Sequence, residues 1–147
     1  MAKYKVLVTA RSFGTAVSKA LDLLAANDCE VKKLVAADGP IPEQLKKELP
    51  EADAVIAGLE DYDEALIACG SKLKVISRYG VGYDKVDVKA AAAHNVAVTI
   101  TPGANGDSVA DMAMALMLDC ARNVTTMDNS IKARNQVRPQ GLEMWEK

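Results

Sequence analysis

Residues 73–84, Leu-Lys-Val-Ile-Ser-Arg-Tyr-Gly-Val-Gly-Tyr-Asp, decide how the rest of the chain is interpreted. The apolar run 73–77 is typical of a buried strand, and it leads into an arginine and two glycines. A second apolar run ends in Thr101-Pro102-Gly103-Ala104-Asn105. If both runs are strands of one parallel sheet, their polar or glycine-rich ends lie on the same edge. Sheets of this kind bind small molecules at that edge.

The chain around this stretch alternates between strand patterns and helix patterns. β-rich runs occur at residues 4–9, 30–35, 52–58, 73–77 and 96–101. Helical spacing separates them, first on a face formed by Val17, Leu21, Leu24 and Ala25, and then over residues 41–49, 61–69 and 86–94. Such repeats predict right-handed βαβ crossovers. We therefore predict an α/β fold with a flavodoxin-like parallel five-stranded sheet, helices on both faces, and a long C-terminal helix.

The last helical segment, from Ser108 to about Asn123, differs from the others. Apolar residues occupy most of its circumference: Val109, Met112, Ala113, Leu116, Met117, Cys120 and Ala121. So wide a stripe indicates a second covering surface, from another domain or another chain. We expect a homodimer through the Met112–Ala121 helix, because burying each Leu or Met is worth about 2 kcal/mol.

The polar sequence after Arg122 predicts a helix continuing to about Ala133 and then a tail. The expected division is residues 1–104 as a flavodoxin-like domain and residues 105–147 as a connecting and dimerisation helix with its tail. Half of the 147 residues are hydrophobic and only 4% are aromatic, which is typical of helices packed on a parallel sheet.

Charge and hydropathy exclude several classes of partner. Eighteen basic and 20 acidic residues give a net charge of −2, without a basic cluster, so neither nucleic acid nor a membrane surface is an expected partner. No apolar stretch approaches the roughly 20 residues of a membrane span, and no signal-peptide pattern follows Met1. We expect a cytoplasmic protein whose partners are small molecules or other proteins.

Metal and thiol chemistry have little support in the sequence. Cys29, Cys69 and Cys120 are widely spaced, which favours reduced structural cysteines over disulfides or a metal site. His94 is the single histidine, and its place at a helix end favours a structural or solvated role. No Ser/His/Asp, Cys/His or paired-carboxylate arrangement can be assembled at the sheet edge. We therefore predict no catalytic residues in this chain.

The loop from Arg78 to Asp84 is the best candidate for a binding site. Gly80 and Gly82 permit positive φ and close approach of a ligand to the main chain, so the N–H groups of Gly80, Val81 and Gly82 can surround a carboxylate beside Arg78. The alternative is a tight strand-to-helix turn with a solvated arginine.

Three other segments have both a functional and a purely structural interpretation. The loop Ala10–Thr15 offers hydroxyls and Arg11 for an anion, or only a helix start. The polar residues among 101–111 could bind a ligand, or they could only cap the helix that follows. The carboxylates of Glu60, Asp61, Asp63 and Glu64 are interpreted as the first turn of a helix.

The run from Leu73 to Asn123 closely resembles the NAD-dependent D-2-hydroxyacid dehydrogenase family, notably its phosphoglycerate dehydrogenase-like branch. The resemblance rests on residues 73–84, on 99–105, on Val109-Ala110-Asp111 and on the helix to Ala121-Arg122-Asn123. It implies that the main chain of the glycine loop holds a substrate carboxylate. The substrate-binding residues are then Arg78, Gly80, Val81 and Gly82.

The resemblance also implies that Thr101 and Pro102 lie near the nicotinamide end of the cofactor, and that the following helix crosses into a nucleotide-binding domain and helps form the dimer. The sequence departs from the family at Ile100, where relatives often have Asn, and at Asp111, where Glu is more usual. Gly58 replaces a basic residue of some phosphoglycerate-specific relatives.

The sequence does not contain the three-glycine dinucleotide fingerprint, which relatives place just after the region like residues 141–144. The resemblance thus implies a substrate-binding domain truncated before the nucleotide-binding domain. It would bind a small 2-hydroxy or 2-oxo acid, bind no cofactor by itself, and belong to an NAD-dependent oxidoreductase acting on CH–OH donors. The alternative is a stand-alone flavodoxin-like binding or signalling module, although the aromatic residues of a flavin site and the acidic cluster of a receiver domain are missing.

Overall fold

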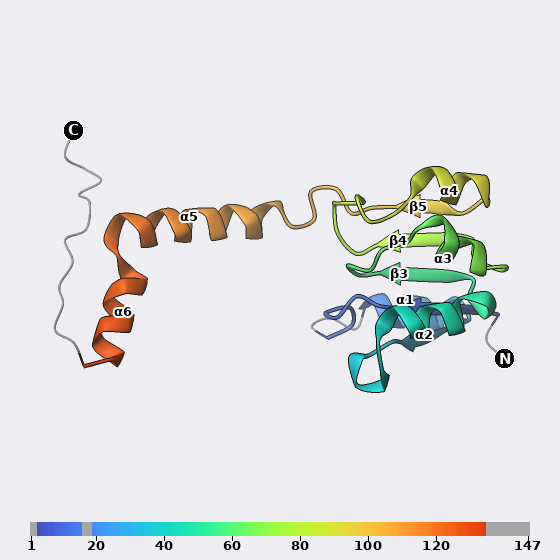
Figure 1. Ribbon diagram of the computed structural model, residues 1–147, viewed down its shortest axis with the longest axis horizontal. Coiled ribbons are helices and arrows are strands. Elements are labelled where there is room, and N and C mark those ends of the chain that lie inside the picture. Colours follow the sequence, from blue (N-terminus) through green and yellow to red (C-terminus); the bar gives the residue numbers. More distant parts are fainter. Residues whose placement is uncertain (1–2, 16–18, 135–147) are drawn as a thin grey trace. The chain divides into compact units, whose positions relative to one another are not determined.

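A computed structural model describes residues 3–15 and 19–134 of the chain. The chain divides into two compact units, Met1–Gly103 and Ala104–Lys147. The first unit contains a parallel β-sheet with helices α1–α4 around it (Figure 1). The second contains helices α5 and α6. The predicted tail after residue 134, like Val17, lies outside the described residues.

The sheet has five strands in the order β2-β1-β3-β4-β5, and every neighbouring pair is parallel. The strands are β1 Tyr4–Val8, β2 Cys29–Lys33, β3 Ala54–Ala57, β4 Val75–Arg78 and β5 Ala97–Thr99. This order confirms the predicted flavodoxin-like sheet. The chain reverses its direction of winding between β1 and β3, so their carboxyl ends form the topological switch point.

The helices of this unit are α1 Lys19–Ala26, α2 Ile41–Glu48, α3 Glu64–Cys69 and α4 Val88–Ala93, with short 3₁₀ turns η1 Ala36–Asp38 and η2 Leu49–Glu51. Two of the helices begin later than predicted, because aspartates set their starts. Asp63 accepts a hydrogen bond from the N–H of Leu66, and Asp87 accepts from Lys89 and Ala90. Such caps satisfy N–H groups that have no partner inside the helix.

A cluster of buried side chains packs against one face of the sheet, and Val6 and Val8 of β1 are buried on the other. Leu7, Val55 and Ile76 face one another across β1, β3 and β4, and all three are fully buried. Side chains of the helices pack over this row, among them Leu45, Leu49, Leu66, Ile67 and Ala91. Each large aliphatic side chain buried here contributes about 2 kcal/mol, so the apolar runs of the sequence form a stable layer.

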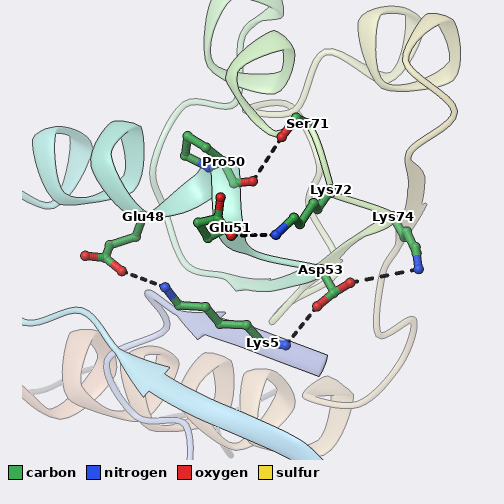
Figure 2. Close-up of polar contacts among 8 residues, drawn as sticks. All are labelled: Lys5, Glu48, Pro50, Glu51, Asp53, Ser71, Lys72 and Lys74. Atoms are coloured by element: carbon green, nitrogen blue, oxygen red, sulfur yellow. Dashed lines mark hydrogen bonds and ion pairs between the residues drawn. The ribbon is translucent and has the colours of Figure 1, made fainter. Parts of the chain in front are cut away.

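Charged side chains near the amino ends of β1, β3 and β4 are paired with one another (Figure 2). Glu48 contacts Lys5 at 2.8 Å and Lys32 at 2.9 Å. Asp53, directly before β3, accepts the N–H of Lys5 at 2.9 Å and lies 3.9 Å from the ammonium group of Lys74. Hydrogen bonds and charge from Lys5 and Lys32 lower the pKa of Glu48 from 4.5 to about 2. We call Lys5, Glu48, Asp53 and Lys74, together with Lys32 near the carboxyl end of β2, the amino-edge network.

The second unit differs from the prediction at Asn123. Helix α5, Gly106–Arg122, ends there because Asn123 adopts a left-handed conformation with φ 55°, and α6, Val124–Lys132, follows as a separate helix. The carboxylate of Asp119 accepts both the N–H and the hydroxyl of Thr125, each at 2.7 Å.

Six large apolar side chains of α5 are exposed: Val109, Met112, Met114, Leu116, Met117 and Leu118. Within the described part of the chain, no helix has the length and apolar character that crossing a membrane requires.

Candidate functional site

A cavity of about 340 Å³ opens at the carboxyl ends of β1, β3 and β4. Three loops line it, with residues Thr9, Ala10, Arg11 and Ser12 after β1, Gly58, Leu59 and Glu60 after β3, and Arg78 and Tyr79 at the end of β4. A second cavity of about 510 Å³ shares Thr9, Arg11 and Glu60 and adds Lys33. The first cavity therefore occupies the switch point of the sheet, where parallel sheets bind ligands.

Thr9 joins the loop after β1 to the loop after β3. Its N–H donates to the carbonyl of Ile56 at 3.0 Å, and its hydroxyl accepts the N–H of Gly58 at 2.7 Å. The same hydroxyl shares a hydrogen bond with the phenol of Tyr62 at 3.3 Å. Burial raises the pKa of Tyr62 far above its ordinary value, so this phenol stays protonated. These bonds fix the floor of the cavity before any ligand arrives.

Gly58 is required by close approach of the two loops. A Cβ at this position would lie 2.9 Å from the carbonyl oxygen of Thr9 and 2.9 Å from Oε2 of Glu60. Real Cβ atoms do not approach a backbone oxygen so closely, and the backbone of Thr9 is fixed by its hydrogen bonds. The position therefore has no space for the basic side chain that the resemblance associates with some relatives.

Arg78 presents a partly fixed guanidinium group to the cavity. Its Nη1 donates to the carbonyls of Ala57 at 3.2 Å and Tyr79 at 3.0 Å. A guanidinium has five N–H donors, so these two contacts orient the group and leave donors for an anion. The ring of Tyr79 meets Phe13 edge-on, with centroids 5.9 Å apart. Lys33 also stabilises the loop after β1, because its ammonium group donates to the carbonyls of Arg11 and Phe13.

Glu60 lies in the cavity, not in a helix. The sequence interpretation placed Glu60 and Asp61 in the first turn of a helix. Helix α3 begins at Glu64 with Asp63 as its cap, so this interpretation is wrong for both residues. Oε2 of Glu60 is buried and has no hydrogen-bond partner among residues 3–15 and 19–134. The only sequence signal for this role is that Glu60 lies two residues after Gly58, just beyond a buried strand.

The N–H groups of the glycine loop, residues 78–84, differ in whether they are free to bind a ligand. Gly80, at φ 156°, donates its N–H to the carbonyl of Arg78 at 2.9 Å. The expectation of three available amides is therefore wrong for Gly80, because the turn itself uses that donor. Val81 and Gly82 are exposed, and the described residues provide no backbone acceptor for their N–H groups. Of the four predicted substrate residues, only Arg78 lines the cavity.

The remaining predicted residues lie outside the cavity. The N–H of Thr101 donates to the carbonyl of Gly80 at 3.0 Å, which ties the segment after β5 to the glycine loop. Thr101 and Pro102 are exposed. His94 ends α4 and is also exposed. No cluster of three or more metal-binding side chains occurs within the described ranges.

Comparison with known proteins connects this geometry to one enzyme family. Residues 7–140 match the profile of the D-isomer specific 2-hydroxyacid dehydrogenase, catalytic domain. A D-3-phosphoglycerate dehydrogenase of Archaeoglobus fulgidus is 35% identical over 129 residues, which are 86% of this chain and 24% of that protein. A hydroxypyruvate reductase of Thermotoga maritima is 40% identical over 91 residues, covering 61% of this chain and 30% of that protein.

Solved structures of 2-hydroxyacid dehydrogenases and similar proteins superpose on this chain. The TT0316 protein of Thermus thermophilus superposes with a TM-score of 0.80 and 32% identity, over 95% of this chain and 45% of that one. An NAD⁺-bound 3-phosphoglycerate dehydrogenase of Entamoeba histolytica gives a TM-score of 0.68 and 25% identity, over 99% of this chain and 45% of the other. The chain thus spans less than half the length of each of these relatives.

Proposed function

Because the chain belongs to the D-isomer specific 2-hydroxyacid dehydrogenase family, we propose that its sheet edge binds the substrate of such an enzyme. The substrate is a small 2-hydroxy or 2-oxo acid, and its carboxylate pairs with Arg78. The observation that carries this proposal is the half-buried guanidinium of Arg78, oriented by two carbonyls in the cavity at the switch point. A preoriented guanidinium pairs with a carboxylate through two parallel hydrogen bonds.

The N–H groups of Val81 and Gly82 supply further donors in this proposal. They follow Arg78 by only a few residues, and the described residues leave both without a backbone acceptor. Gly80 has a different role, since its donor is used within the turn and its conformation shapes the loop. Thr101, hydrogen-bonded to Gly80, and Pro102 would then lie on the side of the acid that faces a nicotinamide.

The residues of this chain do not fit NAD as a resident cofactor. The glycine pair at 80 and 82 lacks the third glycine of the dinucleotide fingerprint, and Lys85 stands where that glycine is required. We therefore assign NAD to residues outside these 147, where it would accept or supply the hydride. The chain contributes acid binding and no hydride transfer of its own.

Calorimetric titration of the 147-residue chain tests this function. D-glycerate and D-lactate should bind with millimolar or better dissociation constants, while glycerol, which lacks the carboxylate, should not bind. The chain should show no NAD-dependent oxidation of either acid. Equal binding of glycerol, or no binding of either acid, would overturn the proposal.

A second part of the proposal concerns assembly. The exposed apolar side chains of α5 between Met112 and Ala121 form a homodimer interface with the same helix of a second copy. Burying several Leu and Met side chains at about 2 kcal/mol each favours association over exposure to water.

Light scattering measures this association directly. The wild-type chain should have the mass of a dimer at micromolar concentration, and a Met112→Lys, Leu116→Lys double variant should be monomeric. Leu23→Lys, a change at an equally exposed side chain of α1, is the matched control and should leave the dimer intact. A wild-type monomer at high concentration would rule out this interface.

A further inference from the structure

The second cavity, of about 510 Å³, has a wall that the first cavity does not share. Leu34, Val35, Ala36 and Ile41 form this wall, and none of them lines the cavity that contains Arg78. Sites for small molecules are typically cavities of roughly 300–1,000 Å³, lined mainly by apolar side chains with a few polar groups. The second cavity therefore has the size and the lining of a ligand site, and the proposed function does not use it.

Hydrogen bonds hold the apolar wall in place. The side-chain amide of Gln44 donates to the carbonyls of Val35 at 2.8 Å and Gly39 at 2.7 Å, which ties the turn after β2 to α2. The N–H of Leu34 donates to the carbonyl of Val8 at 2.8 Å, which fixes the start of this turn on β1. The side chain of Val35 is nevertheless 37% exposed. An apolar side chain on a fixed wall that is still open to water is stabilised when an apolar ligand covers it.

Two cationic side chains, Lys33 and Arg11, line the same cavity. The ammonium group of Lys33 donates to the carbonyls of Arg11 at 2.8 Å and Phe13 at 3.1 Å. An ammonium group has three N–H donors, so one remains for an anion. The guanidinium group of Arg11 has no hydrogen bond or ion pair with any residue in the ranges 3–15 and 19–134. Both cations can therefore pair with an anion without breaking a bond of the fold.

The charges of the lining favour a ligand with a single negative charge. Arg11 and Lys33 contribute two positive charges and Glu60 contributes one negative charge, which leaves one positive charge to be neutralised. Most of the remaining lining is apolar. A second anionic group on the ligand would lie against this apolar wall, where it would lose water without gaining a partner.

We propose that the second cavity binds an aliphatic monocarboxylate, a class of ligand different from the hydroxy acids assigned to the first cavity. The carboxylate pairs with Lys33 and Arg11, and the alkyl chain covers Val35 and Ile41. The ligand requires no 2-hydroxy or 2-oxo group, and Arg78 has no part in binding it, because Arg78 does not line this cavity. The site goes beyond the proposed function and does not depend on it.

Four compounds test the ligand class by amide chemical-shift titration of the 147-residue chain. Hexanoate should give saturable shifts at Lys33, Val35 and Ile41. Burial of the alkyl chain predicts that hexanoate binds about tenfold more tightly than butanoate, which is shorter by two methylene groups. Hexanedioate, which has a second carboxylate at the far end of the chain, and 1-hexanol, which has none, should both bind more weakly than hexanoate.

Substitutions separate the two cavities. Val35→Asp places a negative charge on the apolar wall and should weaken hexanoate binding by at least about tenfold. Val88→Asp is the matched control, because Val88 is an exposed valine that lines neither cavity, and it should leave hexanoate binding unchanged. Arg78→Ala should also leave it unchanged. Arg11→Gln removes one of the two cations and should weaken hexanoate binding about fivefold.

Several outcomes would overturn this inference. If hexanoate does not bind, or binds no more tightly than butanoate or hexanedioate, the cavity does not hold an alkyl chain beside one carboxylate. Loss of hexanoate binding in Arg78→Ala, with binding preserved in Val35→Asp, would place the ligand in the first cavity. The series of compounds needs no variant, so it tests the inference even if a variant fails to fold. Failure of D-glycerate to bind would refute the proposed function alone, because hexanoate would still shift the amides of Lys33, Val35 and Ile41.

Discussion

Charged side chains are paired differently at the two ends of the strands, which we call the amino edge and the carboxyl edge of the sheet. At the amino edge, Glu48 contacts Lys5 at 2.8 Å, and Asp53 accepts a backbone N–H while lying near Lys74 (Figure 2). Lys32 is a second partner of Glu48, at 2.9 Å. At the carboxyl edge, Glu60 buries an oxygen without a partner among the described residues, and Nη1 of Arg78 donates to two backbone carbonyls. Both edges are built from the same five strands and contain comparable residue types.

This difference indicates which charges stabilise the fold and which are available to a ligand. Paired groups at the amino edge gain their hydrogen bonds when the chain folds, so their contribution appears as stability. Groups that stay incompletely paired at the carboxyl edge lower stability and gain partners only when a ligand binds. Substitutions at the two edges should therefore change different measured quantities.

The largest effect is expected from Arg78→Ala on acid binding. Loss of a charge-assisted pair with the carboxylate should weaken D-glycerate binding by at least about 30-fold, or roughly 2 kcal/mol. Titration calorimetry measures the dissociation constant of D-glycerate for the variant and for the wild type. Arg78→Lys, which keeps the charge but not the planar fork, should recover only part of the affinity. Unaltered binding by Arg78→Ala would remove this residue from the site.

Gly58→Ala should reduce stability by about 2 kcal/mol, because the new Cβ must displace the carbonyl of Thr9 or the carboxylate of Glu60. Chemical denaturation monitored by circular dichroism gives the free energy of unfolding. Gly106→Ala is the control, since a Cβ there would have no heavy atom within 4 Å, and it should not destabilise the chain. A stable Gly58→Ala variant would show that the two loops are not held as closely as described.

Glu48→Gln should lower the free energy of unfolding by about 1 kcal/mol at neutral pH, because it weakens the contacts with Lys5 and Lys32. The pKa of Glu48 is lowered when the chain folds, so its contribution is fully present above pH 4.5 and is lost as the pH falls through about 2. Unfolding free energies measured between about pH 6 and pH 2 should therefore fall more steeply for the wild type than for the variant.

Glu30→Gln, at an exposed position of β2, is the matched control and should keep the pH dependence of the wild type. Parallel pH profiles for Glu48→Gln and the wild type would argue against a stabilising role for the amino-edge network.

Glu51→Gln should have no measurable effect on stability. Lys72 hydrogen-bonds to Glu51 and lowers its pKa, but both side chains are exposed, and solvent screens such a pair. Thermal unfolding at low and at high salt is the appropriate measurement. A clear loss of stability at low salt would mean that exposed pairs at this edge contribute more than their burial implies.

The sequence predicted the sheet well because its strands are short apolar runs with clear ends. Residues 73–77 and 52–58 contain the β4 and β3 segments almost completely, and the crossover rule supplied their parallel arrangement. The break at Asn123 was missed, because the residues on both sides favour helix and only a left-handed φ separates α5 from α6. Asn is the residue type that tolerates this conformation, so the signal was weak but present.

The site was predicted less completely than the fold. Arg78 was identified because it ends a buried strand, and the structure places it in the cavity. Glu60 was missed because acidic residues before a helix are usually part of its first turn, and only the contact between the loops after β1 and β3 reveals its other position. The use of the Gly80 donor within its own turn also depends on backbone geometry that residue type does not specify.

The most direct test of the contrast between the two edges is an amide chemical-shift map of the chain titrated with D-glycerate. Our account predicts saturable shifts at the carboxyl edge, at Gly58, Glu60, Tyr79, Val81 and Gly82, and none at Lys5, Glu48 or Asp53. Shifts centred on the amino edge, or spread evenly over the sheet, would contradict the assignment of acid binding to Arg78 and its neighbours.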